Sequence, residues 1–156
     1  MQQLDQLLDE YASSHRNPTN KMFHWLCVPP IVWSVIALLW SLPFPSALQS
    51  DAVPVNWATV ALVLAQVYYF RLSVSLGTGI LMFNVLLLWV TSVIDLAAPW
   101  PLWQIAIAVF VVAWIGQFIG HVYEGKRPSF FKDLQFLLIG PAWLMSFVYQ
   151  TLGLKY

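Results

Sequence analysis

The chain has 156 residues, with seven basic and seven acidic side chains and zero formal net charge; 60% of its residues are hydrophobic and only 9% are charged. A typical soluble domain has roughly 25% charged residues, and one this small has too high a surface-to-volume ratio to bury so much apolar surface. The composition therefore excludes an ordinary soluble domain, and the absence of a basic surplus argues against nucleic-acid binding.

The N-terminal segment predicts a short amphipathic helix on the membrane surface. Leu4, Leu7, Leu8 and Tyr11 have the i, i+3, i+4, i+7 spacing of one apolar helix face. Acidic residues in the same segment are wrong for a cleavable signal peptide, so we expect the first hydrophobic span itself to direct insertion.

A second helix is expected to start near Pro18. Asn17 is a good N-cap residue, and proline suits the first helical position that follows it.

Long apolar segments follow. Between residues 22 and 123 the only formal charges are Asp51, Arg71 and Asp95, and a membrane-spanning helix needs about 20 apolar residues. The expected spans cover residues 22–42, 57–70, 76–94, 102–123 and 134–154. The chain is thus predicted to be one all-α domain over residues 1–156, a polytopic membrane helical bundle of four to five transmembrane segments with an N-terminal amphipathic helix.

The last apolar segment leaves two arrangements open. Gly140-Pro141 interrupts it, so it is expected to be either a kinked span or a re-entrant helix.

Basic residues predict the orientation of the bundle. They occur before the first span and in the loop at residues 124–133, whereas the loop at residues 43–56 has no lysine or arginine. Because basic loops stay in the cytoplasm, we expect a cytoplasmic N-terminus, in the inner membrane of a bacterium or the endoplasmic reticulum of a eukaryote. Lys155 falls on the opposite side in a five-span arrangement.

The three histidines of the chain are predicted to lie at one membrane depth. His15 precedes the first span, His24 begins it and His121 ends the fourth. The predicted topology therefore brings all three to the cytoplasmic face, although they come from distant parts of the sequence.

The end of the fourth span carries further polar groups. Gln117, His121 and Glu124 are four and three residues apart, which places them within an arc of roughly 100° on one helix face. Gly116 and Gly120 form a small-xxx-small pair that allows a neighbouring helix to approach closely.

These side chains suit a metal ion. Imidazole and carboxylate groups bind iron, zinc, copper or manganese, and two or three histidines with one carboxylate are the ligand set of non-haem iron oxygenases. The lone Cys27 argues against a thiolate zinc site. In the alternative interpretation, the histidines are ordinary amphipathic side chains at the headgroup level, and the glycine pair serves helix packing alone.

The segments around the histidines resemble the motifs of a known family, DUF962 or Mpo1-like. Its N-terminal motif is similar to Tyr11-x-x-x-His15-x-Asn17-Pro18-x-Asn20-x-x-x-His24. Its second motif is similar to Trp114-x-x-Gln117-Phe118-x-Gly120-His121-x-x-Glu124-x-x-x-Pro128. The Gly140-Pro141 segment also fits. Two positions depart from the pattern: many members have histidine in place of Asn17, and Cys27 replaces a usual glycine.

The resemblance implies an Fe(2+)-dependent dioxygenase of fatty acid α-oxidation. Such an enzyme converts a 2-hydroxy long-chain fatty acid and O2 into an acid one carbon shorter. His15, His24 and His121 would hold the iron. Glu124 would be a further ligand or the acceptor that orients a ligand imidazole, and Gln117 and Asn20 would support the ligands.

Three cations near the same face are expected to attract the substrate carboxylate from the membrane surface: Arg16, Lys126 and Arg127.

The alternative function is non-enzymatic, a small membrane protein that binds lipid or assists a complex. A transporter is disfavoured because ionisable groups are missing near the expected bilayer midplane.

Overall fold

Helices make up the regular secondary structure of this computed structural model, which describes residues 2–13, 15–48, 55–125 and 137–156. The elements in chain order are α1 (Gln2–Ser13), α2 (Pro18–Trp40), η1 (Ser46–Leu48), α3 (Trp57–Leu72), α4 (Val74–Ala97), α5 (Leu102–Glu124) and α7 (Ile139–Thr151). The predicted all-α membrane bundle is confirmed.

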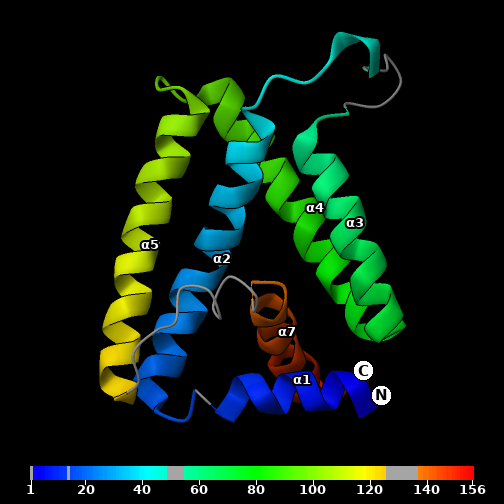
Figure 1. Ribbon diagram of the computed structural model, residues 1–156, viewed down its shortest axis with the longest axis vertical. Coiled ribbons are helices and arrows are strands. Elements are labelled where there is room, and N and C mark those ends of the chain that lie inside the picture. Colours follow the sequence, from blue (N-terminus) through cyan, green and yellow to red (C-terminus); the bar gives the residue numbers. More distant parts are fainter. Residues whose placement is uncertain (1, 14, 49–54, 126–136) are drawn as a thin grey trace.

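Four helices run lengthwise through the molecule. α2, α4 and α5 have 23, 24 and 23 residues and are long and apolar enough to cross a membrane, while α3 is a shorter apolar helix. Figure 1 shows α2, α3, α4 and α5 extending between the two ends of the bundle, with α1 lying across one end. We call this the α1 end.

The helix α7 is short and stays near the α1 end (Figure 1). Its 13 residues rise about 20 Å, whereas the hydrocarbon core of a bilayer is about 30 Å thick. The described part of the last apolar segment is therefore too short to cross a bilayer by itself.

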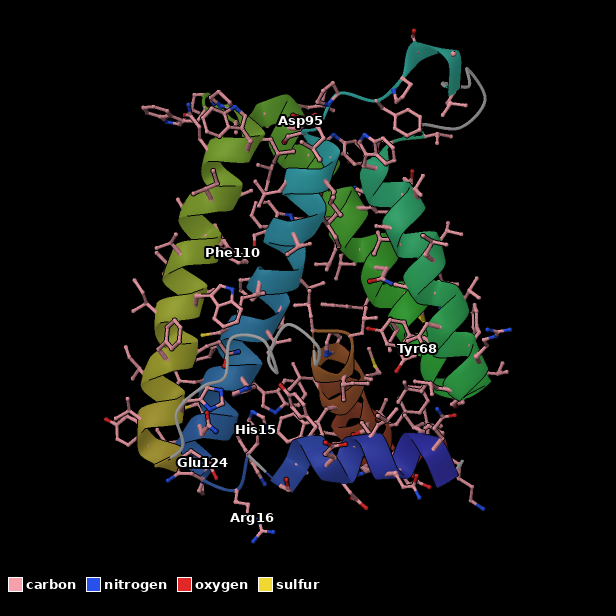
Figure 2. The ribbon with its side chains drawn as sticks, viewed as in Figure 1. His15, Arg16, Tyr68, Asp95, Phe110 and Glu124 are labelled. Atoms are coloured by element: carbon pink, nitrogen blue, oxygen red, sulfur yellow. The ribbon has the colours of Figure 1, made fainter. Side chains whose placement is uncertain are left out.

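This arrangement returns the C-terminus to the α1 end. The Ser75 hydroxyl, at the start of α4, donates a hydrogen bond of 2.8 Å to the Lys155 carbonyl. The C-terminus, next to Lys155, therefore lies at the α1 end (Figure 1), as does Arg16, whereas Asp95 lies at the opposite end (Figure 2). In a five-span arrangement Lys155 would lie on the side opposite the other basic residues, but in the structure it lies at the same end as Arg16.

The apolar face of α1 packs onto protein. Leu4, Leu8 and Tyr11 are 1%, 7% and 6% exposed, and they join a core cluster with Ile139 and Trp143 of α7. The amphipathic helix was predicted correctly, but its apolar stripe packs on α7 and is not left free for a membrane surface.

The expected helix start at Pro18 is also confirmed. The Asn17 side-chain oxygen accepts a hydrogen bond of 2.8 Å from the Thr19 amide, and Pro18 occupies the first helical position.

Two glycines bring α5 against the first half of α2. A Cβ atom on Gly116 would lie 2.6 Å from the Cys27 sulfur, and one on Gly120 would lie 2.8 Å from Asn20 Oδ1 and 2.9 Å from Phe23 Cβ. A side chain at Gly116 would displace the Cys27 sulfur, and one at Gly120 would collide with Phe23 Cβ and disturb the close helix contact. The small-residue pair thus acts as predicted, and it brings His121 on α5 close to the start of α2.

Candidate metal centre

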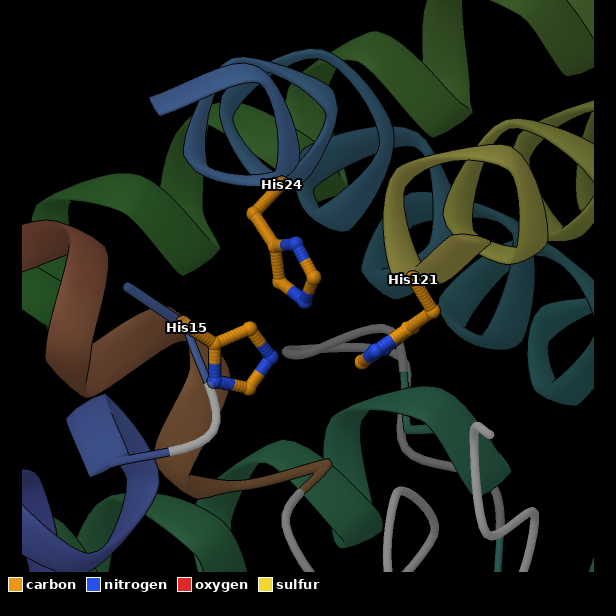
Figure 3. Close-up of side chains that lie close together, drawn as sticks. All are labelled: His15, His24 and His121. Atoms are coloured by element: carbon orange, nitrogen blue, oxygen red, sulfur yellow. The ribbon is translucent and has the colours of Figure 1, made fainter. Parts of the chain in front are cut away.

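The three histidines meet at the α1 end of the bundle. His15 lies in the link between α1 and α2, His24 in the second turn of α2, and His121 in the last turn of α5. One ligand nitrogen from each lies within 4.8 Å of the other two, and the side chains are only 3%, 3% and 5% exposed. Figure 3 shows the rings directed toward a shared space.

Backbone carbonyls orient two of the rings. His15 Nδ1 lies 2.6 Å from the Tyr11 carbonyl oxygen, and His24 Nδ1 lies 3.0 Å from the Asn20 carbonyl oxygen. A carbonyl oxygen only accepts, so each Nδ1 carries the proton and each Nε2 keeps its lone pair. A ring N–H donated to a carbonyl is the usual support of a metal-binding histidine.

The donor set fits a metal ion. Metal–nitrogen bonds of about 2.1 Å place ligand nitrogens on one ion roughly 3–4 Å apart, and the spacing here is at most 4.8 Å. Small rotations of the rings would close the difference. Three imidazoles suit iron, zinc, copper or nickel.

Glu124 holds the α1–α2 link against the end of α5. Its Oε1 accepts a hydrogen bond of 2.9 Å from the Arg16 amide. Its Oε2 accepts one of 2.9 Å from the Asn17 amide and one of 3.0 Å from the Asn20 side chain. These three bonds favour a positioning role over direct ligation, because both oxygens are already engaged by the segment that carries His15.

The two asparagines serve the same junction. Besides capping α2 with its oxygen, Asn17 donates from its side-chain nitrogen to the Tyr123 carbonyl at 2.9 Å. Asn17 thus joins α2 to α5 with both ends of its amide. Asn20 is fully buried and binds the Glu124 carboxylate.

Gln117 faces a small cavity beside the histidines. This cavity of about 40 Å³ is also lined by Tyr11, His24, Trp114 and His121. Gln117 is 5% exposed, and within the described ranges its Oε1 has no hydrogen-bond partner. It offers an acceptor to a ligand in the cavity.

The cations expected to attract a carboxylate are only partly described. The Arg16 side chain is exposed at the α1 end and extends away from the bundle in Figure 2. Lys126 and Arg127 lie outside the described residues.

Two aromatic walls of the site were not predicted. The Tyr11 ring stacks on His15 with centroids 4.2 Å apart, and the Trp143 ring lies 5.6 Å from His15 and 6.3 Å from His24. The i, i+4 spacing of Tyr11 and His15 was a usable signal for the first contact. No local sequence pattern predicts the contact of Trp143 with the histidines, because only the tertiary fold brings α7 to the site.

Known proteins resemble this chain over almost its full length. The profile of the family described as 2-hydroxy-palmitic acid dioxygenase Mpo1-like matches residues 1–152. The 2-hydroxy-palmitic acid dioxygenase of Saccharomyces cerevisiae is 31% identical over 137 residues, which cover 86% of this chain and 73% of the yeast protein. No solved structure matches the chain significantly. With its histidine motifs inside the matched region, the chain belongs to the Mpo1-like family.

Proposed function

We propose that the protein is an iron(II)-dependent dioxygenase that cleaves the C1–C2 bond of 2-hydroxy long-chain fatty acids and yields the acid one carbon shorter. The observation that carries the proposal is the buried cluster of three histidines at one end of an apolar helical bundle. The named activity of the yeast relative, on 2-hydroxy-palmitic acid, supports the same substrate class.

In this proposal His15, His24 and His121 hold the iron. The first two present Nε2, because their Nδ1 protons are donated to backbone carbonyls. Bound iron(II) would supply redox chemistry and open coordination positions for substrate and O2.

The remaining side chains orient the substrate and exclude water. Gln117 Oε1 is proposed to accept a hydrogen bond from the 2-hydroxyl group, since this buried acceptor faces the cavity. Arg16 is proposed to attract the carboxylate from the surface, together with Lys126 and Arg127. The rings of Tyr11 and Trp143 cover the histidines and keep the site apolar around them.

We also propose that the α1 end faces the cytoplasm. The described loops and turns of the opposite end, residues 41–48, 55–56 and 95–101, contain no lysine or arginine, whereas Arg16 and Lys155 lie at the α1 end. This asymmetry supports a cytoplasmic N-terminus, and labelling from the two sides of the membrane tests it.

The test of function is iron content and turnover in detergent-purified protein. The wild type should bind iron and consume O2 together with a 2-hydroxy long-chain fatty acid, and a chelator should stop the reaction. His121→Ala should lose both properties but still insert, because the hydrophobic spans are intact. Full iron content and turnover in folded His121→Ala would refute the proposed site. A wild type with neither property would refute the enzyme and leave the lipid-binding alternative.

A further inference from the structure

A second and larger hollow lies inside the bundle near the histidines. It has a volume of about 220 Å³ between α2, α3 and the residues just before α7. We call it the inner cavity; its lining includes Val32, Ile36 and Leu39 of α2 and Ala61, Ala65 and Tyr69 of α3. The walls are predominantly aliphatic, so the cavity suits an apolar occupant.

The inner cavity adjoins the site at the start of α7. Leu137 lines both the inner cavity and the small cavity that contains His24, His121 and Gln117. The Tyr69 hydroxyl donates a hydrogen bond of 2.6 Å to the Leu138 carbonyl, which fixes this segment against α3. The Leu137 side chain is therefore the common wall of the two cavities.

The inner cavity extends away from the histidines along α3. Its lining runs from Tyr69 to Ala58, and 11 helical residues rise about 16 Å. Asn84 adds a polar side chain to this wall, and its amide nitrogen lies 3.4 Å from Gln66 Oε1. An apolar lining that extends over this length matches a hydrocarbon chain better than a compact polar ligand.

We propose that the inner cavity holds the acyl chain of the substrate and that α3 determines the chain length that fits. This inference rests on the proposed function. The carboxyl end would lie at the histidines, and the methyl end would point toward Ala58. Movement of Leu137 would join the two cavities.

Three alanines of α3 are the positions at which the proposed limit on acyl-chain length can be tested. Ala58, Ala61 and Ala65 are spaced by three and four residues, and all three line the inner cavity. A large side chain at Ala65, one turn from Tyr69, would block the cavity near the site. One at Ala61, a turn further on, would leave room for shorter chains. The position of the substitution should therefore set the longest chain accepted.

The test uses the full-length protein in detergent with a long-chain 2-hydroxy fatty acid that carries a photoreactive diazirine at its methyl end. Label should attach to the wild type in the segments of α2 and α3 around Leu39 and Ala58. Ala61→Phe should reduce labelling and lower turnover of long relative to short chains by about tenfold or more. Ala108→Phe, on the exposed face of α5, is the matched control and should behave like the wild type.

Several outcomes would overturn the inference. One is unchanged labelling and chain-length preference in Ala61→Phe; another is attachment around Trp25 and Met145, which line a separate cavity of about 130 Å³. If Ala61→Phe does not fold, Ala65→Leu must shift the preference toward short chains at least as far. Labelling needs neither iron nor turnover. A wild type that takes the label at α3 but lacks iron would refute the proposed function and retain the acyl-chain cavity.

Discussion

At the scale of single residues, the histidine site depends on groups that fix the orientation of the imidazole rings. Carbonyl oxygens of Tyr11 and Asn20 orient two imidazoles, and Glu124 anchors the link that carries His15. Backbone carbonyl and amide groups take part in these contacts as much as side chains do. The consequence is that a conservative change beside a ligand can disturb the site without removing a ligand.

Glu124→Gln should weaken the site without eliminating it. The glutamine amide has one oxygen where the carboxylate has two. Its NH2 group would face N–H groups from which the carboxylate now accepts hydrogen bonds. We expect a loss of about 10–100-fold in iron affinity or turnover. The matched control is Asp95→Asn, a carboxylate-to-amide change at the opposite end, which should have no effect. Collapse of iron binding at saturating iron would instead indicate that Glu124 is a direct ligand.

Gln117→Leu tests the buried acceptor. If Gln117 Oε1 binds the 2-hydroxyl group, its removal should lower kcat/KM for the 2-hydroxy acid by roughly ten- to a hundredfold, since a lost hydrogen bond to a buried group costs about 1–3 kcal/mol. Iron content should stay at the wild-type level. Gln104→Leu, on the exposed part of α5, is the control. Unchanged kinetics in Gln117→Leu would exclude this contact with substrate.

At the scale of elements, the junction of α2 and α5 determines where the site lies. Gly116 and Gly120 let Cys27 and Asn20 pack directly against α5. The side chain of Cys27 occupies the space beside Gly116, so the departure from the family pattern at this position is accommodated within the helix contact. His121 follows Gly120 directly, and close packing here therefore also positions a proposed ligand.

Gly120→Val should destabilise the protein and disturb the metal centre together. Its Cβ would come within 2.8 Å of Asn20 Oδ1 and 2.9 Å of Phe23 Cβ, and overpacking of this kind costs about 1–3 kcal/mol. Thermal unfolding in detergent should show a lower Tm than in the wild type, with reduced iron content. Ala108→Val, exposed on the same helix, should keep both. A wild-type Tm in Gly120→Val would contradict the close contact.

At the scale of the whole molecule, the bundle separates an apolar body from one polar, histidine-bearing end. Both termini and His15 lie at the α1 end, and Asp95 lies at the opposite end (Figures 1 and 2). The four lengthwise helices α2, α3, α4 and α5 return the chain to the α1 end, and α7 also lies near that end. A substrate from the bilayer would thus meet the site close to the headgroup region.

Labelling of single cysteines with an impermeant maleimide in intact cells or sealed vesicles checks this orientation. In a Cys27→Ala background, Ala97→Cys should react only with reagent on the non-cytoplasmic side, and Ser13→Cys only with reagent on the cytoplasmic side. Both replaced side chains are exposed, at opposite ends of the bundle. The reverse pattern would overturn the cytoplasmic N-terminus. Reaction of both from one side would contradict a membrane-crossing bundle.

The sequence by itself determined the membrane class, the helices and the shared depth of the histidines. Each of these depends on local properties: apolar length, charge spacing and the 3.6-residue period that puts Gln117, His121 and Glu124 on one face. The Asn17 cap and the glycine pair on α5 were predictable for the same reason, because capping and small-residue spacing are properties of a few neighbouring positions.

Only the tertiary structure decided how distant segments meet. It identified the hydrogen-bond partners of Glu124, placed Trp143 against His15, and turned α7 back toward the α1 end. It also created the inner cavity, whose walls come from α2, α3 and the start of α7. Contacts between helices depend on which faces pack together and at what angle, and residue spacing within a single helix does not contain that information.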